Sequence, residues 1–221
     1  MYVGLKMLPR GKFVTATKDT LVTEAQKLMV ENHFWMLLVV EGDQLVGYIS
    51  KEDVSAALPS AATSLSKHEI NYLLSKLTAE KILKKDVPTV TPDTTIEEAA
   101  QRMHDEDLAG LAVVDRKSKL LGFINRSVIL EVLVEEMGLN QGGSRIAFEV
   151  VDRTGVIHEV SGIIADMGVS IIATATFYHN DRRMVVFRVQ TDDPKPIEQA
   201  IQDRGYTIVG PEVFKEEWSH L

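Results

Sequence analysis

GYISKED at residues 47–53 and GFINRSV at residues 122–128 are two copies of one pattern, 75 positions apart. Each stretch ends an apolar strand and begins a helical pattern. In the first copy, Ser50 and Asp53 place a hydroxyl and a carboxylate at the start of that helix, where free backbone N–H groups favour a phosphate. The second copy has asparagine and valine at these positions. The pattern therefore predicts a duplicated fold in which only the first copy keeps both polar groups.

The duplication extends well beyond these stretches. Residues 13–41 align with residues 87–115 at an offset of 74, with ten identical positions, and one extra residue in the second polar turn changes the offset to 75. Insertions in repeats fall in loops, as this one does. Each copy reads as an extended segment, an amphipathic helix, two strands and a closing helix, which gives the order βαββα twice. The expected extended segments are 13–16 and 87–90, and the expected strands are 36–40, 45–49, 111–114 and 120–124.

Capping signals mark where the helices should begin. An Asp-Thr pair precedes the first helix of each copy, and Thr94 with Glu97 has the spacing of a capping box. A similar pair, Ser66 and Glu69, predicts a helix over 66–77 between the copies, after a loop at 59–65. The apolar run that includes Phe34, Trp35 and Met36 is expected to lie in a strand and in the core.

The order of expected helices and strands changes after a glycine-containing linker at 139–144. The order that follows is βαββαβ, which is ferredoxin-like. Its expected elements are a strand at 146–151, a helix at 156–167, strands at 170–178 and 184–190, a helix between Asp193 and Gly205, and a strand at 206–209.

These patterns together predict an α+β (mixed α/β) protein. Its expected parts are a first copy at 1–58, a linker with a helix at 59–80, a second copy at 81–138, a linker at 139–144, a third domain at 145–214 and a tail at 215–221.

Composition narrows the classes of function. The net charge of −8 disfavours binding to nucleic acid or to an anionic membrane surface, because both depend on clustered lysine and arginine. The absence of cysteine excludes a thiol nucleophile and a thiolate metal site, and the histidines are too scattered to predict any other metal site. With no signal peptide and no apolar run long enough to span a bilayer, we expect a cytoplasmic protein.

At these residues the chain resembles two known families. The two repeats resemble a tandem cystathionine-β-synthase (CBS) domain pair, also called a Bateman module, and residues 145–214 resemble an ACT domain. The order of these parts, with the helix between the repeats, resembles that of the AcuB family of acetoin utilization proteins. The resemblance implies a regulatory protein rather than an enzyme, connected to acetoin or carbon metabolism.

The CBS resemblance implies a cleft for an adenosine compound: AMP, ADP, ATP, S-adenosylmethionine or NAD. Carried over by position, Ser50 would bind phosphate, Asp53 would bind the ribose hydroxyls, and extended segments would flank the adenine. In this fold the run Phe34-Trp35-Met36 would lie near the cleft. The implied nucleotide-binding residues are Val14, Thr15, Met36, Leu37, Ser50, Lys51 and Asp53. The equivalent residues of a second cleft are Pro88, Thr89, Gly110, Leu111, Asn125 and Arg126. Because Asn125 and Val128 replace the hydroxyl and the carboxylate, the second cleft is degraded or binds something else.

The ACT resemblance implies a site for an amino acid or a similar small effector, usually between two copies of the domain. Helix N-terminal amides would bind an α-carboxylate there. The implied residues are Asp152, Arg153, Thr154, Gly155, Val156 and Ile171. A single ACT sheet leaves edges that normally pair with another copy, so a homodimer is expected.

Two other readings stay open. Ser50 and Asp53 fit a simple helix cap, and Asp152 fits the same role, so the protein could be a structural dimer with decayed sites. The other alternative is an enzyme of acetoin breakdown, but the sequence offers no activated nucleophile, acid–base pair or catalytic cofactor motif. The protein that would receive a regulatory signal cannot be read from the sequence.

Overall fold

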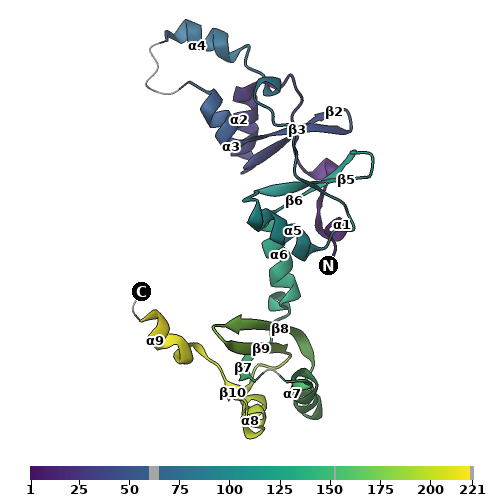
Figure 1. Cartoon of the computed structure of the whole chain (residues 1–221), viewed down its shortest axis with the longest axis vertical. Coiled ribbons are helices and arrows are strands. Elements are labelled where there is room, and N and C mark those ends of the chain that lie inside the picture. Colours follow the sequence, from purple (N-terminus) through teal and green to yellow (C-terminus); the bar gives the residue numbers. More distant parts are fainter. Residues whose placement is uncertain (60–64, 152, 220–221) are drawn as a thin grey trace. The chain divides into compact units, whose positions relative to one another are not determined.

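The chain is mixed α+β, as expected, and a computed structural model describes residues 1–59, 65–151 and 153–219 (Figure 1). It divides into two compact units, Met1–Leu130 and Glu131–Leu221, each of which has its own core. Most of the loop expected at 59–65 lies outside the described residues. None of the described helices is long and apolar enough to cross a bilayer.

The first unit contains the βαββα order twice. The first copy consists of α2 (Val22–Glu31), β2 (Met36–Glu41), β3 (Gln44–Ser50) and α3 (Lys51–Ala57). The second consists of β4 (Thr89–Val90), α5 (Ile96–Asp105), β5 (Gly110–Val114), β6 (Leu120–Asn125) and α6 (Arg126–Glu136), the last of which crosses into the second unit. The expected extended segment at 13–16 makes a single parallel bridge, between Ala16 and Val39. The equivalent pair in the second copy, Val90 and Val113, belongs to the parallel pairing of β4 with β5.

The repeated glycine is explained by a backbone that crosses it. A Cβ atom on Gly47 would lie 1.6 Å from Leu83 Cδ1 and 2.7 Å from the carbonyl oxygen of Lys84. A Cβ atom on Gly122 would lie 2.7 Å from the carbonyl oxygen of Leu8. In each copy a segment from outside the repeat therefore passes over the same strand position at a distance that only glycine permits.

The N-terminal segment completes the second copy, although no element was expected there. Helix α1 (Val3–Lys6) is followed by β1 (Leu8–Pro9), which pairs with β6, and the sheet order is β1-β6-β5-β4. Val3 N–H donates to the carbonyl oxygen of Thr94 at 2.9 Å. A short 3₁₀ turn, η1 (Arg10–Lys12), then leads into the first copy.

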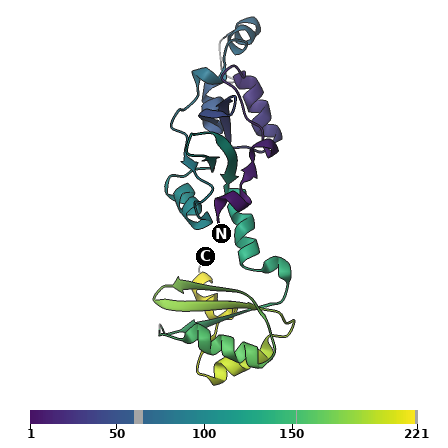
Figure 2. The same cartoon turned by 90° about the vertical axis from the view of Figure 1, so that its right-hand side faces the viewer.

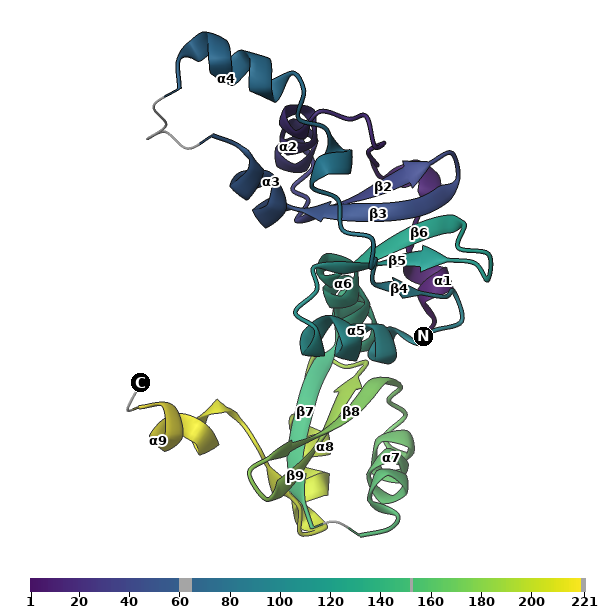
Figure 3. The same ribbon diagram turned by 45° about the horizontal axis from the view of Figure 1, so that its top comes forward.

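Strand β2 is buried on both faces and joins the two copies. Leu37 and Val39 pack into the core of the first copy, beneath its own helices. Leu38, from the opposite face of β2, packs with Ala112 and Phe123 of the second copy. Figure 3 shows the β2-β3 pair beside the sheet that contains β5 and β6 (Figure 3). Because the alternating side chains of one strand serve two cores, the copies are packed as one unit.

Two helix boundaries differ from those expected. The capping box of α5 uses Thr95 and Glu98, one residue later than the Thr94 and Glu97 pair. Thr94 Oγ1 instead accepts from the N–H of Thr91 at 3.2 Å, which closes a turn before the helix. Helix α4 (Lys67–Leu74) begins at the expected box of Ser66 and Glu69 but ends three residues before the expected end, and η2 (Ala79–Lys81) follows it.

The second unit has the expected βαββαβ order. Its elements are β7 (Ser144–Val150), α7 (Val156–Asp166), β8 (Ile171–His179), β9 (Arg182–Val189), α8 (Lys195–Asp203) and β10 (Thr207–Ile208), preceded by η3 (Leu139–Gln141). The antiparallel sheet has the order β10-β7-β9-β8, and α7 and α8 cover one of its faces (Figure 2). The short elements η4 (Pro211–Phe214) and α9 (Lys215–Trp218) follow, and Phe214 packs against the other face.

Candidate functional site

The first unit contains a cavity of about 720 Å³ between its two copies. Equivalent positions of the repeat contribute to it from both sides, which indicates that the duplication itself creates the cavity. Its wall consists of His33, Phe34, Trp35, Met36, Tyr48, Ser50, Glu52, Lys84, Glu106, Asp107, Leu108, Ala109, Phe123, Asn125, Arg126 and Ser127. This size is typical of a pocket for a small organic ligand.

Ser50 and Asp53 form a complete capping box at the start of α3. The Asp53 carboxylate oxygen Oδ2 accepts from the backbone N–H of Ser50 at 3.0 Å and from its hydroxyl at 2.7 Å. The N–H of Asp53 in turn donates to Ser50 Oγ at 3.2 Å. The helix-cap role that the sequence allowed is therefore realised, and Ser50 still lines the cavity.

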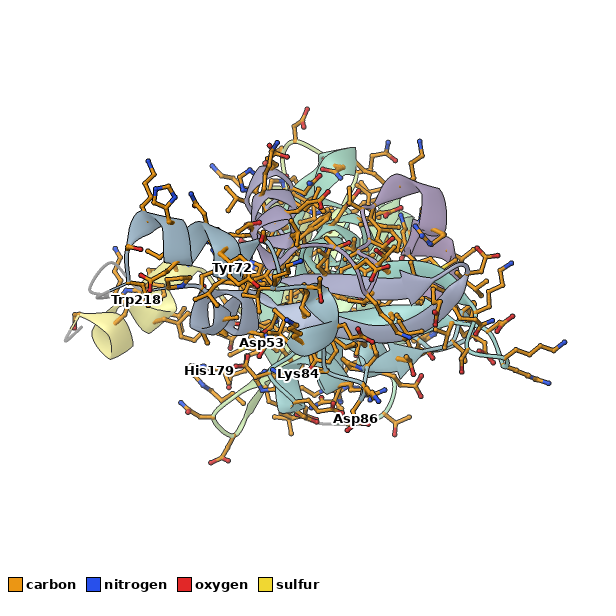
Figure 4. The ribbon with its side chains drawn as sticks, turned by 90° about the horizontal axis from the view of Figure 1, so that it is seen from above. Asp53, Tyr72, Lys84, Asp86, His179 and Trp218 are labelled. Atoms are coloured by element: carbon orange, nitrogen blue, oxygen red, sulfur yellow. The ribbon has the colours of Figure 1, made fainter. Side chains whose placement is uncertain are left out.

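The other carboxylate oxygen of Asp53 is bound to a lysine that was not expected at the site. Lys84 Nζ lies 2.8 Å from Asp53 Oδ1, and the two labelled side chains lie together in Figure 4 (Figure 4). Partial burial acts to raise the pKa of Asp53, but hydrogen bonds from Lys84 and Ser50 outweigh it, so this pKa lies below its ordinary value. The hydrogen bond to Asp53 correspondingly raises the pKa of Lys84. Both groups are therefore charged at neutral pH.

Trp35 lies on the cavity wall rather than in the core. Its side chain is 60% exposed because β2 begins only at the next residue, Met36, which is buried. The ammonium of Lys51 lies 4.6 Å from the centre of the Trp35 ring, a cation–π contact. An exposed indole at a cavity wall offers a flat face on which an aromatic base could stack.

The second copy caps its closing helix with a different side chain. Asn125 Oδ1 accepts from the N–H of Val128 at 3.0 Å, so Asn125 caps this helix as Ser50 caps α3. The second copy has no carboxylate at the position of Asp53, where Val128 stands. Val128 is buried. Arg126 donates to the carbonyl oxygen of Leu108 at 2.8 Å and pairs with the Asp107 carboxylate at 2.6 Å.

The structure brings some of the implied binding residues to the cavity and leaves others away from it. Met36, Ser50, Asn125 and Arg126 line the cavity. Asp53 and Lys51 are not on the wall but contact residues that are: Asp53 pairs with Lys84, and the Lys51 ammonium lies over the Trp35 ring. The remaining implied residues, none of which is part of the cavity wall, are Val14, Thr15, Leu37, Pro88, Thr89, Gly110 and Leu111.

Several of those remaining residues already have other contacts. The side chains of Leu37 and Leu111 are fully buried in the core. Thr15 Oγ1 accepts from the Arg10 guanidinium at 3.0 Å, and the carbonyl oxygen of Thr89 accepts from Arg102. An adenine base placed beside Thr15 or Thr89 would therefore meet polar groups that already accept hydrogen bonds from arginine side chains.

A smaller cavity of about 240 Å³ lies in the second unit, lined by Glu149, Val150, Val151, Arg153, Arg204, Gly205, Tyr206 and Thr207. Arg153 donates to the Tyr206 hydroxyl at 2.7 Å and pairs with Glu159. The Tyr206 hydroxyl also donates to Glu159 at 2.8 Å. The hydrogen bond from Arg153 lowers the pKa of Glu159, so this cluster is a charged network at neutral pH.

Of the effector residues that the ACT resemblance implies, Arg153 alone lines this smaller cavity within the described part of the chain. Asp152 lies outside the described residues. Thr154 is exposed, and Gly155 has a φ of 91° at the start of α7. Val156 is buried in the core, and Ile171 begins β8 with a partly exposed side chain.

The comparison with family models identifies the modules. A CBS domain model matches residues 5–60 and 79–135, and an ACT domain model matches residues 144–205. The chain belongs to the CBS-domain family. It contains a tandem CBS pair followed by an ACT domain, both of which are regulatory modules.

Relatives of the CBS pair occur in proteins of very different size. The chain is 29% identical over 136 residues to a CBS domain-containing protein of Dictyostelium discoideum, covering 61% of this chain and 94% of that protein. It is 30% identical over 121 residues to a homoserine O-acetyltransferase of Methanosalsum zhilinae, which covers 54% of this chain. The chain spans about a fifth of the length of the homoserine O-acetyltransferases it matches.

Solved structures share the fold of the CBS pair. CBSX2 from Arabidopsis thaliana is 26% identical, with a TM-score of 0.50 over 64% of this chain and 98% of that one. A structure of CBSX2 in complex with AMP is equally similar, with a TM-score of 0.50, 26% identity, and coverage of 61% of this chain and 96% of that one. AcuB from Vibrio cholerae has the same fold, with a TM-score of 0.52 at 21% identity over 65% of this chain and 98% of that one.

Proposed function

We propose that the protein is a ligand-sensing regulator whose CBS pair binds an adenosine compound in the cavity between its two copies. The observation that carries the proposal is the cavity itself, which has Ser50 and Lys84 on its wall and the exposed Trp35 ring beside them. Polar groups of both signs next to a flat aromatic face suit a ligand made of a base, a sugar and a phosphate. The AMP complex of the related CBSX2 supports the same ligand class.

Isothermal titration of the full chain with AMP, ATP, S-adenosylmethionine and NAD tests this proposal. We expect saturable heat with at least one of the four and a weaker response from Asp53→Ala. Asp43→Ala is a matched control, because Asp43 also pairs with a lysine, Lys119, at 2.9 Å, but Lys119 does not line the cavity as Lys84 does. Flat heat for all four ligands would contradict the proposal.

The ACT domain is proposed to bind a second effector, an amino acid or a similar small molecule. Arg153 supplies a guanidinium beside the smaller cavity, and guanidinium groups bind carboxylates in a bidentate manner. Ligand binding to either module would shift the balance between conformations of the protein and alter its contact with a regulated partner. Native mass spectrometry of protein purified from its own cells would identify any effector that is retained.

We further propose a homodimer in the cytoplasm with no catalytic activity of its own. The narrowest form of the proposal links the protein to acetoin or carbon metabolism, and growth of a deletion strain on acetoin tests that link. Unimpaired growth would remove the acetoin assignment without affecting the ligand-binding proposal.

One specific observation favours a second function, that of a structural dimerisation protein with decayed sites. Both oxygens of the Asp53 carboxylate already have protein partners, and Arg153 is held by Glu159 and Tyr206. If these contacts are purely structural, no adenosine compound will bind and Asp53→Ala will change only stability. The titration described above separates the two functions.

A further inference from the structure

Lys84 occupies a special place in the first unit, because it comes from the start of the second CBS copy and pairs with a residue of the first. Its backbone is fixed against β3 by two hydrogen bonds of 2.9 Å with the backbone of Tyr48. Its side chain is half exposed and lines the cavity, with the ammonium 2.8 Å from Asp53 Oδ1 and 5.8 Å from the centre of the Tyr48 ring. A fixed backbone with a half-exposed side chain allows the ammonium to change partners without rearranging the fold.

The Asp53 carboxylate, as it stands, can accept from only one of the two hydroxyls of a ribose diol, because three of its roughly four acceptor positions are taken. Its Oδ2 atom accepts from the N–H and the hydroxyl of Ser50, and its Oδ1 atom is bound to Lys84. A ribose diol brings two O–H donors, so it competes for the oxygen that Lys84 occupies. Displacing Lys84 leaves an ammonium without its counter-charge, which costs free energy unless a new anion takes the place of the carboxylate.

Two of the other acidic groups on the cavity wall are already paired, Asp107 with Arg126 and Glu106 with Arg102. Glu52 also attracts the Lys84 ammonium, but more weakly than Asp53 does. When a ligand displaces Lys84 from Asp53, an anion on that ligand can therefore pair with the released ammonium.

We propose that Lys84 is a specificity-determining residue that moves from Asp53 to a phosphate of the ligand, so that the cavity selects adenosine 5′-phosphates over adenosine compounds without a phosphate. The inference rests on the proposed function and narrows its ligand class. The same exchange would free Asp53 for the ribose hydroxyls. S-adenosylmethionine brings a cationic sulfonium in place of the phosphate and is disfavoured by the displaced ammonium.

The test is a titration of the full chain with AMP and with adenosine, comparing Lys84→Met with the parent. In the parent, AMP should bind more tightly than adenosine. In Lys84→Met, the dissociation constant for AMP should rise about tenfold or more, which is the usual effect of losing a charge-assisted hydrogen bond. The dissociation constant for adenosine should stay the same or fall, because Asp53 is then open.

Two further variants make the result specific. Lys119→Met is the matched control, because Lys119 forms an ion pair of 2.9 Å with Asp43 and has a similar exposed fraction, 48% against 50% for Lys84. It should leave both dissociation constants unchanged. Lys84→Arg should retain the preference for AMP, which shows that the charge and not the lysine packing is responsible.

An unchanged ratio of the AMP and adenosine dissociation constants in Lys84→Met would overturn the inference while leaving the proposed function intact. An equal loss of affinity for both ligands would do the same, because it indicates a general disturbance of the cavity. If the parent binds neither AMP nor adenosine, the inference fails, and the proposed function fails with it only if ATP, S-adenosylmethionine and NAD also give no heat.

Discussion

Asp53 contributes to the stability of the first unit and is also the residue proposed to bind the ribose of the ligand. It closes the first turn of α3 and also holds Lys84 from a segment outside the repeat. Its pKa is lower in the folded state than in the unfolded chain, so the stabilisation is present above the ordinary carboxyl pKa of about 3.9 and is lost as the pH falls through the lower folded value. The pKa of Lys84 is raised, so its contribution is lost only as the pH rises through a value above about 10.4.

The substitution Asp53→Asn is expected to lower the free energy of unfolding of the first unit by about 1 kcal/mol, because it removes the charge that accepts from Ser50 and pairs with Lys84 while leaving the Ser50 cap in place. The difference from the parent should be constant between about pH 5 and pH 9 and should shrink below about pH 4. Urea unfolding followed by Trp35 fluorescence in a Trp218→Phe background measures it. Glu69→Gln, in the exposed capping box of α4, is the control and should cost less. A difference that persists at pH 2 would contradict this explanation.

The motif glycine gives a second prediction at the scale of one residue. Gly47→Ala places a methyl group within 1.6 Å of Leu83 Cδ1, and the nearby carbonyl oxygen of Lys84 cannot retreat without breaking its pairing with Tyr48. We expect a loss of roughly 1–3 kcal/mol in the free energy of unfolding. Gly11→Ala, which would meet nothing within 4 Å, is the matched control in the same unit. Equal stability of the two variants would show that the close approach is unimportant.

At the scale of secondary-structure elements, α1 and β1 belong to the second CBS copy although they precede the first in the chain. Val3 in α1 is fully buried, whereas Leu5 in the same helix is 74% exposed. Val3→Ala should therefore lower the free energy of unfolding by roughly 1–3 kcal/mol, and Leu5→Ala by less than about 0.5 kcal/mol. The same urea experiment measures both. Similar values for the two variants would mean that α1 is not packed against the second copy.

The sequence predicts the repeated elements well because their signals are local and occur twice. It cannot predict that β1 pairs with β6, since Leu8–Pro9 is too short to show a period and its partner is over 100 residues away. The capping box of α5 is ambiguous for a clear reason: Thr94 and Thr95 each have a glutamate three residues later. The structure resolves this by using Thr94 in the turn and Thr95 as the cap.

The candidate site shows the same division. Ser50 and Met36 were expected at the binding cleft by position, from the CBS resemblance, and both line the cavity. Lys84 could not be predicted, because it precedes residue 87, where the alignment between the two copies begins. Trp35 was expected in a strand and in the core, near the cleft; it lies just before β2 and lines the cavity.

At the scale of the whole molecule, the free edge of the ACT sheet predicts self-association. Strand β8 spans nine residues, is paired on one side by β9, and carries exposed side chains such as Phe177 and Tyr178. A long exposed edge normally pairs with another chain. Light scattering should therefore give twice the chain mass of 24.6 kDa at micromolar concentration.

Lysine substitutions on that edge test where the copies meet. The double variant Thr174→Lys and Thr176→Lys, both on β8, should shift the protein toward the monomer by like-charge repulsion. Thr207→Lys, on the opposite edge strand β10, is the control and should remain dimeric. A monomeric parent would contradict the dimer, and a dimeric double variant would place the interface elsewhere.

Binding of an adenosine compound in the cavity between the CBS copies is tested most directly by a crystal structure of the protein grown with excess AMP. We expect AMP in the cavity, with its ribose hydroxyls within hydrogen-bond distance of the Asp53 carboxylate and its phosphate beside Lys84. A cavity that holds only water next to Ser50, or AMP bound at another place on the chain, would contradict it.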